Sequence, residues 1–99
     1  MSIIAKRALR EFWEAPKYTD AKGPLQAWHA GAKKAIWATP HDIKGQYHNA
    51  SIIKGNRAVF NVGGNKYRVV AAIDYTRQIV FIRFVGTHRQ YDLIDVETI

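Results

Sequence analysis

The N-terminal third of the chain repeats apolar side chains at intervals of three and four residues, which is the pattern of amphipathic helices. It predicts a first helix over Ala5–Glu14, ended by Pro16, and a second from Pro24 to about Trp37, with Pro40 after its end. The buried sides are expected to be Ala8, Leu9, Phe12 and Trp13 in the first helix and Leu25, Trp28, Ala32, Ala35 and Ile36 in the second.

From Arg57 onward the apolar period changes to two, and the segments become rich in Val, Ile, Phe and Tyr. Three strands are predicted, Arg57–Val62, Lys66–Asp74 and Arg77–Val85. Two-residue loops at Gly63-Gly64 and Tyr75-Thr76 would join them into an antiparallel meander.

The other segments are less regular. Ser2–Ile4 is either a short edge strand or the lead into the first helix, and Thr39–Asn56 is expected to be a loop with one helical turn. A further helical turn is expected around Arg89–Leu93. The pattern therefore predicts a single α+β domain over residues 1–99, with two N-terminal helices packed on one face of a three- to four-stranded antiparallel sheet.

The predicted register sorts the side chains onto two faces of the sheet. Two-residue loops pair Asn61 with Lys66 and place Arg68 directly opposite Arg83. The chain leaves the last strand beside this group, so His88 and then Tyr91 should follow close to it. The opposite face is apolar and should be covered by the helices; it carries Ala58, Phe60, Val62, Tyr67, Val69, Ala71, Ile73, Val80, Ile82 and Phe84.

Two arginines directly opposite each other destabilise a sheet unless an anion lies between them. A phosphate is the anion whose geometry best matches a guanidinium group. The net charge of +7, from 15 Lys and Arg against 8 Asp and Glu, agrees with an anionic partner such as nucleic acid, an acidic protein or a membrane surface.

Other classes of protein are disfavoured by composition. The absence of cysteine excludes a disulfide framework and thiolate metal sites. The N-terminus lacks the apolar region of a secretory signal, and no apolar run approaches the roughly 18 residues that span a bilayer. A cytoplasmic protein without a membrane partner is expected.

Five residues suit the cleavage of a phosphodiester: Lys66, Arg68, Arg83, His88 and Tyr91. Cations stabilise charge that grows on the phosphate oxygens, while imidazole and phenol groups exchange protons. If the substrate is RNA, its 2′-hydroxyl can be the nucleophile, so neither a metal nor another cofactor is expected. Asn61 lies in the same predicted group, and Lys33 and Lys34 would steer phosphates from the second helix.

Each of these residues also has an ordinary interpretation. Lysines and arginines on strands and helices are most often solvated surface, and a single histidine near a loop is more often a surface residue than a catalyst. The convergence of several polar groups at one end of the sheet favours the functional interpretation.

Two strings of residues resemble the HigB family of bacterial toxins. They run over Val59–Ala71 and over Ile79–His88, followed by Tyr91-Asp92, and the Phe-Asn…Asn-Lys-Tyr-Arg and Arg-Phe-Val-Gly-Thr-His segments within them are specific. Ile4–Trp13 and Ala27–Ala35 are also similar to the family. The resemblance covers nearly the whole chain and is weakest between Thr39 and Gly55.

The resemblance implies a RelE-like fold and a type II toxin that cuts messenger RNA in the A site of the translating ribosome of a bacterium, inhibiting translation and growth. It also implies a helix-turn-helix antitoxin of the HigA type. The family's catalytic set falls on the same five residues, Lys66, Arg68, Arg83, His88 and Tyr91. Relatives often carry an acidic residue where this chain has Gln90, so a carboxylate base is missing there, and His88 or Lys66 would have to serve as the base.

Two other functions fit the same surface. A non-catalytic RNA- or ribosome-binding module would block translation without cutting, and fresh 5′ ends on cellular messages distinguish the two. A protein of the same fold that only assists a repressor in binding DNA is the third alternative.

Overall fold

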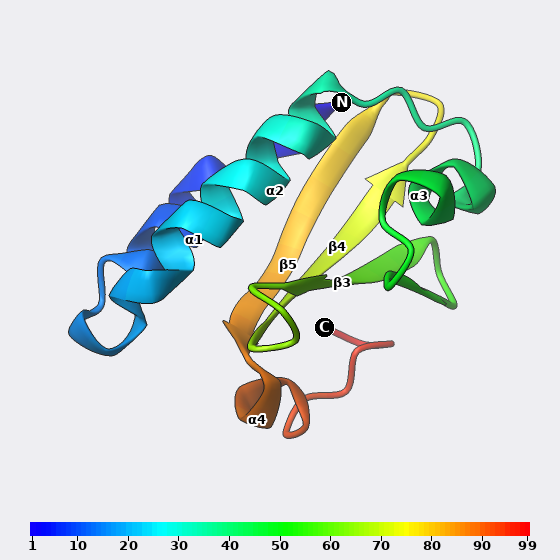
Figure 1. Ribbon diagram of the computed structural model, residues 1–99. Helices are drawn as coiled ribbons and strands as arrows, with labels where there is room; N and C mark the ends of the chain where they lie inside the picture. The colour runs from blue at the N-terminus through cyan, green and yellow to red at the C-terminus, as the bar shows by residue number, and fades with distance from the viewer.

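The computed structural model describes residues 1–99 and contains one mixed sheet with helices on one side (Figure 1). The sheet has five strands in the order β1-β5-β4-β3-β2; β1 is parallel to β5 and the other neighbours are antiparallel. The α+β class is therefore confirmed, but the sheet is larger than the three or four antiparallel strands expected. The strands are β1 (Ser2–Ile4), β2 (Ser51–Ile53), β3 (Arg57–Val62), β4 (Tyr67–Asp74) and β5 (Ile79–Thr87); the helices are α1 (Lys6–Trp13), the 3-10 helix η1 (Pro16–Ala21), α2 (Lys22–Lys34), α3 (Pro40–Gln46) and α4 (His88–Tyr91).

The two N-terminal helices are confirmed, with shifted ends, and both lie over the same face of the sheet (Figure 1). α2 ends at Lys34 rather than near Trp37, yet Trp37 still enters the core, with 1% of its surface exposed. Trp28 and Trp37 pack on Phe60 of β3, with ring centres 5.1 and 6.0 Å away. This aromatic group joins the helices to the sheet and buries much of the apolar area of the chain.

The segment expected to be a loop with one helical turn contains the two-turn helix α3 and the strand β2. The Asp42 carboxylate accepts hydrogen bonds from the backbone N–H groups of Ala38 and Thr39, at 2.8 and 3.2 Å, which fixes the start of α3. Ile43 is fully buried and anchors this helix on the core. A seven-residue helix and a three-residue strand are too short to produce a recognisable period, which explains why the sequence pattern did not reveal them.

The β3–β4 loop is longer than expected. Val62 pairs with Tyr67, so the turn comprises Gly63, Gly64, Asn65 and Lys66 instead of two glycines. Gly63 and Gly64 have φ of 65° and 59°, values that glycine adopts without a steric penalty. The register moves by two residues, which keeps every side chain on its expected face but pairs Asn61 with Arg68 and puts Lys66 in the turn.

The predicted register between β4 and β5 was wrong for two reasons. Asp74 pairs with Ile79 across a four-residue turn, in which its Oδ1 accepts the backbone N–H of Arg77 at 2.9 Å. Farther along, Ala71 pairs with Ile82 and Val70 with Phe84, so that Arg83 is an extra, bulged residue.

The bulge changes the faces beyond it. Arg68 lies opposite Gly86 and not opposite Arg83, so the predicted pair of facing arginines does not exist. Val85 packs against the helix-side core, while Phe84 pairs with Val70 on the other face, the reverse of the prediction.

The helix-free face of the sheet is partly covered by the C-terminal segment, which runs back toward β3 (Figure 1). Arg57 donates a hydrogen bond of 2.6 Å from Nη2 to the carbonyl of Ile99. Val59 and Val70, which lie outside the helix-side core, are 3% and 0% exposed. No helix of the protein has the length and apolar character needed to cross a bilayer.

Candidate active site

Four of the five predicted catalytic residues lie where β4 begins and β5 ends. There, α4 starts directly after β5, and a capping box fixes its first turn: Gln90 accepts from the Thr87 N–H at 2.9 Å and donates from its own N–H to the Thr87 hydroxyl at 3.1 Å. The backbone N–H of His88 donates to the carbonyl of Lys66 at 3.2 Å. The β3–β4 turn and α4 are therefore held side by side.

Arg68 is the one charged side chain classed as buried, with 9% of its surface exposed. Its Nη1 donates to the carbonyls of Asn65 and Tyr67, at 2.8 and 3.3 Å. The guanidinium carbon lies 6.0 Å from the centre of the Tyr91 ring, within the range of a cation–π contact. Nη2 and Nε have no acceptor in the protein, so a rigidly held cation keeps donors free for an anion.

His88 projects from the first turn of α4 with its ring next to a carboxylate. Its Nδ1 lies 3.3 Å from Oδ2 of Asp92, one helical turn away, and both side chains are more than half exposed. A carboxylate on one ring nitrogen orients the imidazole and leaves Nε2 available for a substrate proton. In this arrangement the imidazole is able to exchange a proton with a substrate.

Lys66 is held differently from the prediction. Its ammonium group is ion-paired with Asp20 of η1, and the Tyr67 hydroxyl donates to the same carboxylate. The hydrogen bond to Lys66, followed by that from Tyr67, lowers the pKa of Asp20, while the bond to Asp20 raises the pKa of Lys66. Lys66 therefore stays protonated and is suited to attract phosphate rather than to accept a proton.

η1 has a second contact with the site. Gln90 donates from Nε2 to the Tyr18 hydroxyl at 3.2 Å, and the Tyr18 ring stacks on Phe12 of α1 at 4.4 Å. Both polar ends of the Gln90 side chain are thus used, one in the cap of α4 and one on η1. Gln90, which stands where relatives often carry an acidic residue, therefore has a structural role in this chain.

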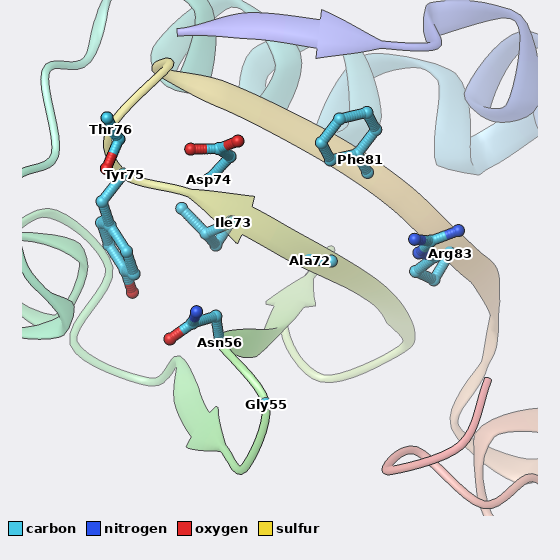
Figure 2. A pocket seen from close by; sticks show the side chains of 9 residues that line it. All are labelled: Gly55, Asn56, Ala72, Ile73, Asp74, Tyr75, Thr76, Phe81 and Arg83. Atoms are coloured by element: carbon cyan, nitrogen blue, oxygen red, sulfur yellow. The ribbon is translucent and has the colours of Figure 1, made fainter.

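Arg83 lies apart from the other four. The bulge leaves it exposed on the helix-free side of the sheet, with its guanidinium carbon 5.9 Å from the centre of the Phe81 ring. Its side chain lines a hollow that extends toward the β4–β5 turn and includes Asp74 and Tyr75 (Figure 2). Three strand residues, or about 10 Å, separate it from the position of Gly86, which faces Arg68.

Comparison with known proteins gives matches over most of this chain. Residues 21–94 match the family described as HigB toxin, the RelE-like toxic component of a toxin-antitoxin system. The chain is 35% identical over 94 residues to proteins named mRNA interferase toxin HigB in Escherichia coli K12 and mRNA interferase HigB in Shigella flexneri, covering 93% of this chain and 88% of each relative. An mRNA interferase HigB of Escherichia coli O6:H1 is 29% identical over the same length.

This chain belongs to the HigB toxin family. The predicted resemblance to HigB is thereby confirmed, and the strings that suggested it lie within the matched residues, except Ile4–Trp13, which precedes them. The helices, sheet and α4 described above are compatible with the RelE-like description of that family.

The three predicted RNA-binding residues of this HigB-family chain are divided between two regions. Asn61 pairs with Arg68 on the neighbouring strand and donates to the carbonyl of Asn49 at 3.3 Å, so it borders the site. Lys33 and Lys34 end α2 near the N-terminus, whose amino group donates to the Lys33 carbonyl. β1 runs beside the start of β5, whereas α4 follows its end, so these lysines lie at the far end of the sheet (Figure 1).

Sequence reasoning missed three residues of this HigB site: Tyr18, Asp20 and Asp92. Asp92 could have been predicted, because it follows His88 by four residues and a helical turn was expected there. The contacts of Tyr18 and Asp20 join positions 72 and 46 residues apart, and no pattern in the sequence indicates them.

Proposed function

We propose that this chain is the toxin of a type II toxin–antitoxin system and cuts messenger RNA on the translating ribosome. Its relatives are named mRNA interferases, and the family is described as the toxic component of such a system. The observation that carries the proposal from family to mechanism is the His88–Asp92 pair, set on the helix that also presents Tyr91 to Arg68.

The reaction follows from the chemistry of these groups. Nε2 of His88 removes the proton of the RNA 2′-hydroxyl, and the 2′-oxygen forms a bond to the adjacent phosphorus. The bond from phosphorus to the 5′-oxygen breaks, and the Tyr91 hydroxyl donates the proton that the leaving oxygen takes up. The products are a 2′,3′-cyclic phosphate and a 5′-hydroxyl, without a metal ion or a protein nucleophile.

The cations around these two residues stabilise the transition state. The free donors of Arg68 bind a non-bridging oxygen of the phosphate, where negative charge grows during attack. Lys66, kept charged by Asp20, adds positive potential at the rim of the site. Arg83 holds the RNA on the other side of Arg68, along β5.

The partners follow from the family. We expect an antitoxin of the helix-turn-helix HigA type and entry of the toxin into the ribosomal A site, where the message is single-stranded and accessible. The net charge of +7 favours approach to ribosomal RNA.

The test is induction of the chain in bacteria, followed by primer extension on a defined message. New 5′ ends and growth arrest are expected with the wild type, and neither with His88→Ala. His48→Ala is the matched control, since His48 is exposed in the loop before β2, and it should behave as the wild type does. Growth arrest without new 5′ ends would instead indicate a module that binds the ribosome and blocks it.

A further inference from the structure

A hollow of about 450 Å³ lies on the helix-free side of the sheet, next to the proposed catalytic group but outside it. The turn between β2 and β3, the turn between β4 and β5, and the β5 bulge form its walls (Figure 2). Its polar and aromatic lining residues are Asn56, Asp74, Tyr75, Thr76, Phe81 and Arg83.

Arg83 supplies an unpaired cation at the edge of this hollow. It is exposed, forms no ion pair, and rests over the Phe81 ring at 5.9 Å. In a regular ladder it would pair with a residue of β4, but the bulge leaves it without a partner there, and its side chain lines the hollow. Bulges are common beside active sites.

Asn56 and Asp74 supply polar groups that can identify a ligand. The Asn56 amide makes no hydrogen bond within the protein, so it offers both a donor and an acceptor. Asp74 Oδ1 accepts from the Arg77 backbone, whereas Oδ2 has only the Arg77 Nε at 3.9 Å. A carboxylate accepts and never donates, so it pairs with amino groups and not with carbonyls.

Phe81 completes the chemistry with an aromatic ring beside Arg83, whereas the ring of Tyr75 packs against the helix-side core. Aromatic rings stack on nucleic-acid bases of any sequence. A cation for phosphate, a ring for stacking and polar groups for an edge are together the requirements of a nucleotide.

We propose that the hollow is a base-recognition subsite for one nucleotide of the RNA substrate, which flanks the phosphate that is cut. This inference rests on the proposed function. Arg83 binds the backbone phosphate of that nucleotide, and its base stacks on Phe81. Asp74 and Asn56 read its edge, so bases that bear an exocyclic amino group are preferred and uracil is disfavoured.

The first test maps 5′ ends across all messages of cells that express the chain. In the wild type, uracil should be depleted about tenfold at one fixed position beside the cut, the discrimination expected of one specific hydrogen-bonded contact. Asp74→Asn keeps an oxygen for the Arg77 N–H but adds an amino group that can donate to a uracil carbonyl, so the depletion should disappear. Glu14→Gln, on an exposed residue at the end of α1, is the matched control and should preserve it.

The second test does not depend on cleavage. Adenosine monophosphate and uridine monophosphate are titrated into the full-length chain, and the backbone amide signals of Asn56 and Phe81 are followed by NMR. Adenosine monophosphate should shift them at lower concentration than uridine monophosphate, and Arg83→Ala should weaken both.

The two proposals fail separately. Base distributions that are identical in the wild type and Asp74→Asn, together with unshifted signals at the hollow, would overturn the subsite even if the RNA is cut. Selective binding of adenosine monophosphate by a chain that cuts no message would support the subsite and reject the endonuclease.

Discussion

The Lys66 ammonium group is ion-paired with the carboxylate of Asp20, 46 residues earlier in the chain. Since Tyr67 also donates to this carboxylate, η1 is attached to the first residue of β4 and to the turn before it. The pair therefore influences both the stability of the fold and the charge at the rim of the site.

The first prediction concerns pH. The pKa of Asp20 is lowered on folding, so its contribution to stability is present above its ordinary pKa of 3.8 and is lost as pH falls through the folded value. The pKa of Lys66 is raised, so its contribution is lost only above 10.5. Asp20→Asn should therefore lower Tm near neutral pH, and the difference from the wild type should shrink steadily in acid.

Thermal unfolding of both proteins across the acid range checks this. Glu11→Gln is the control, because Glu11 forms an exposed ion pair with Arg7 on α1, of the kind that contributes little to stability. A Tm difference for Asp20→Asn that stays constant down to the lowest pH would show that the carboxylate acts through its shape and not its charge.

The second prediction separates His88 from Asp92. His88→Ala should reduce the cleavage rate by about 10²- to 10⁴-fold, the usual contribution of a positioned acid or base. Asp92→Asn should lose less, because the ring remains and only the carboxylate beside Nδ1 is replaced. Single-turnover cleavage of ribosome-bound message provides both rates.

Asp95→Asn is the matched control for this pair. Asp95 is an exposed residue of the C-terminal segment whose Oδ1 accepts the Glu97 N–H, a bond that asparagine can keep. An Asp92→Asn enzyme with an unchanged rate would contradict the orienting role.

The third prediction tests the close packing at the end of β5. A Cβ at Gly86 would lie 2.5 Å from Cζ of Phe84 and 2.8 Å from Oε1 of Gln90, so Gly86→Ala should destabilise the fold by about 1–3 kcal/mol. At Gly45 in α3 a Cβ meets nothing within 4 Å, and Gly45→Ala should stabilise by about 0.5–1 kcal/mol. Urea unfolding measures both, and equal midpoints for the two variants would be inconsistent with the packing described.

The fourth prediction concerns Lys33 and Lys34. Their distance from α4 implies that Lys33→Gln, Lys34→Gln leaves the single-turnover rate unchanged. Binding to ribosomes should weaken, with a shallower dependence on salt, because two cations that attract phosphate are gone. A large fall in the rate of the bound complex would place these lysines closer to the chemistry than the structure does.

Much of the fold was evident in the sequence because the spacing of apolar residues and the positions of Gly and Pro indicated the same elements. β3 has the predicted limits, and the two N-terminal helices and the β3–β4–β5 meander are present. The pairing register of β4 with β5 was not evident. Turn length depends on local hydrogen bonds such as that from the Arg77 N–H to Asp74, and a bulge cannot be recognised from the alternation of apolar and polar residues.

The candidate site was predicted in outline but not in detail. Four site residues were expected together because they stay close to one end of the strands even when the register moves by two residues and the faces are unchanged. They are Lys66, Arg68, His88 and Tyr91. The positions of Asp20 and Arg83 depend on contacts between distant segments and on one bulge, which composition and spacing do not encode.

That bulge has a consequence for how this protein tolerates insertions and deletions. Removing Arg83 as a residue, rather than replacing it, would close the ladder while Phe84 keeps Val70 and Val85 keeps Val69 as partners. Val85 would stay in the interior, and α4 would still follow β5 at the same end of the sheet. A chain one residue shorter at this point would thus keep α4 in place while losing a cation that the proposed function assigns to RNA.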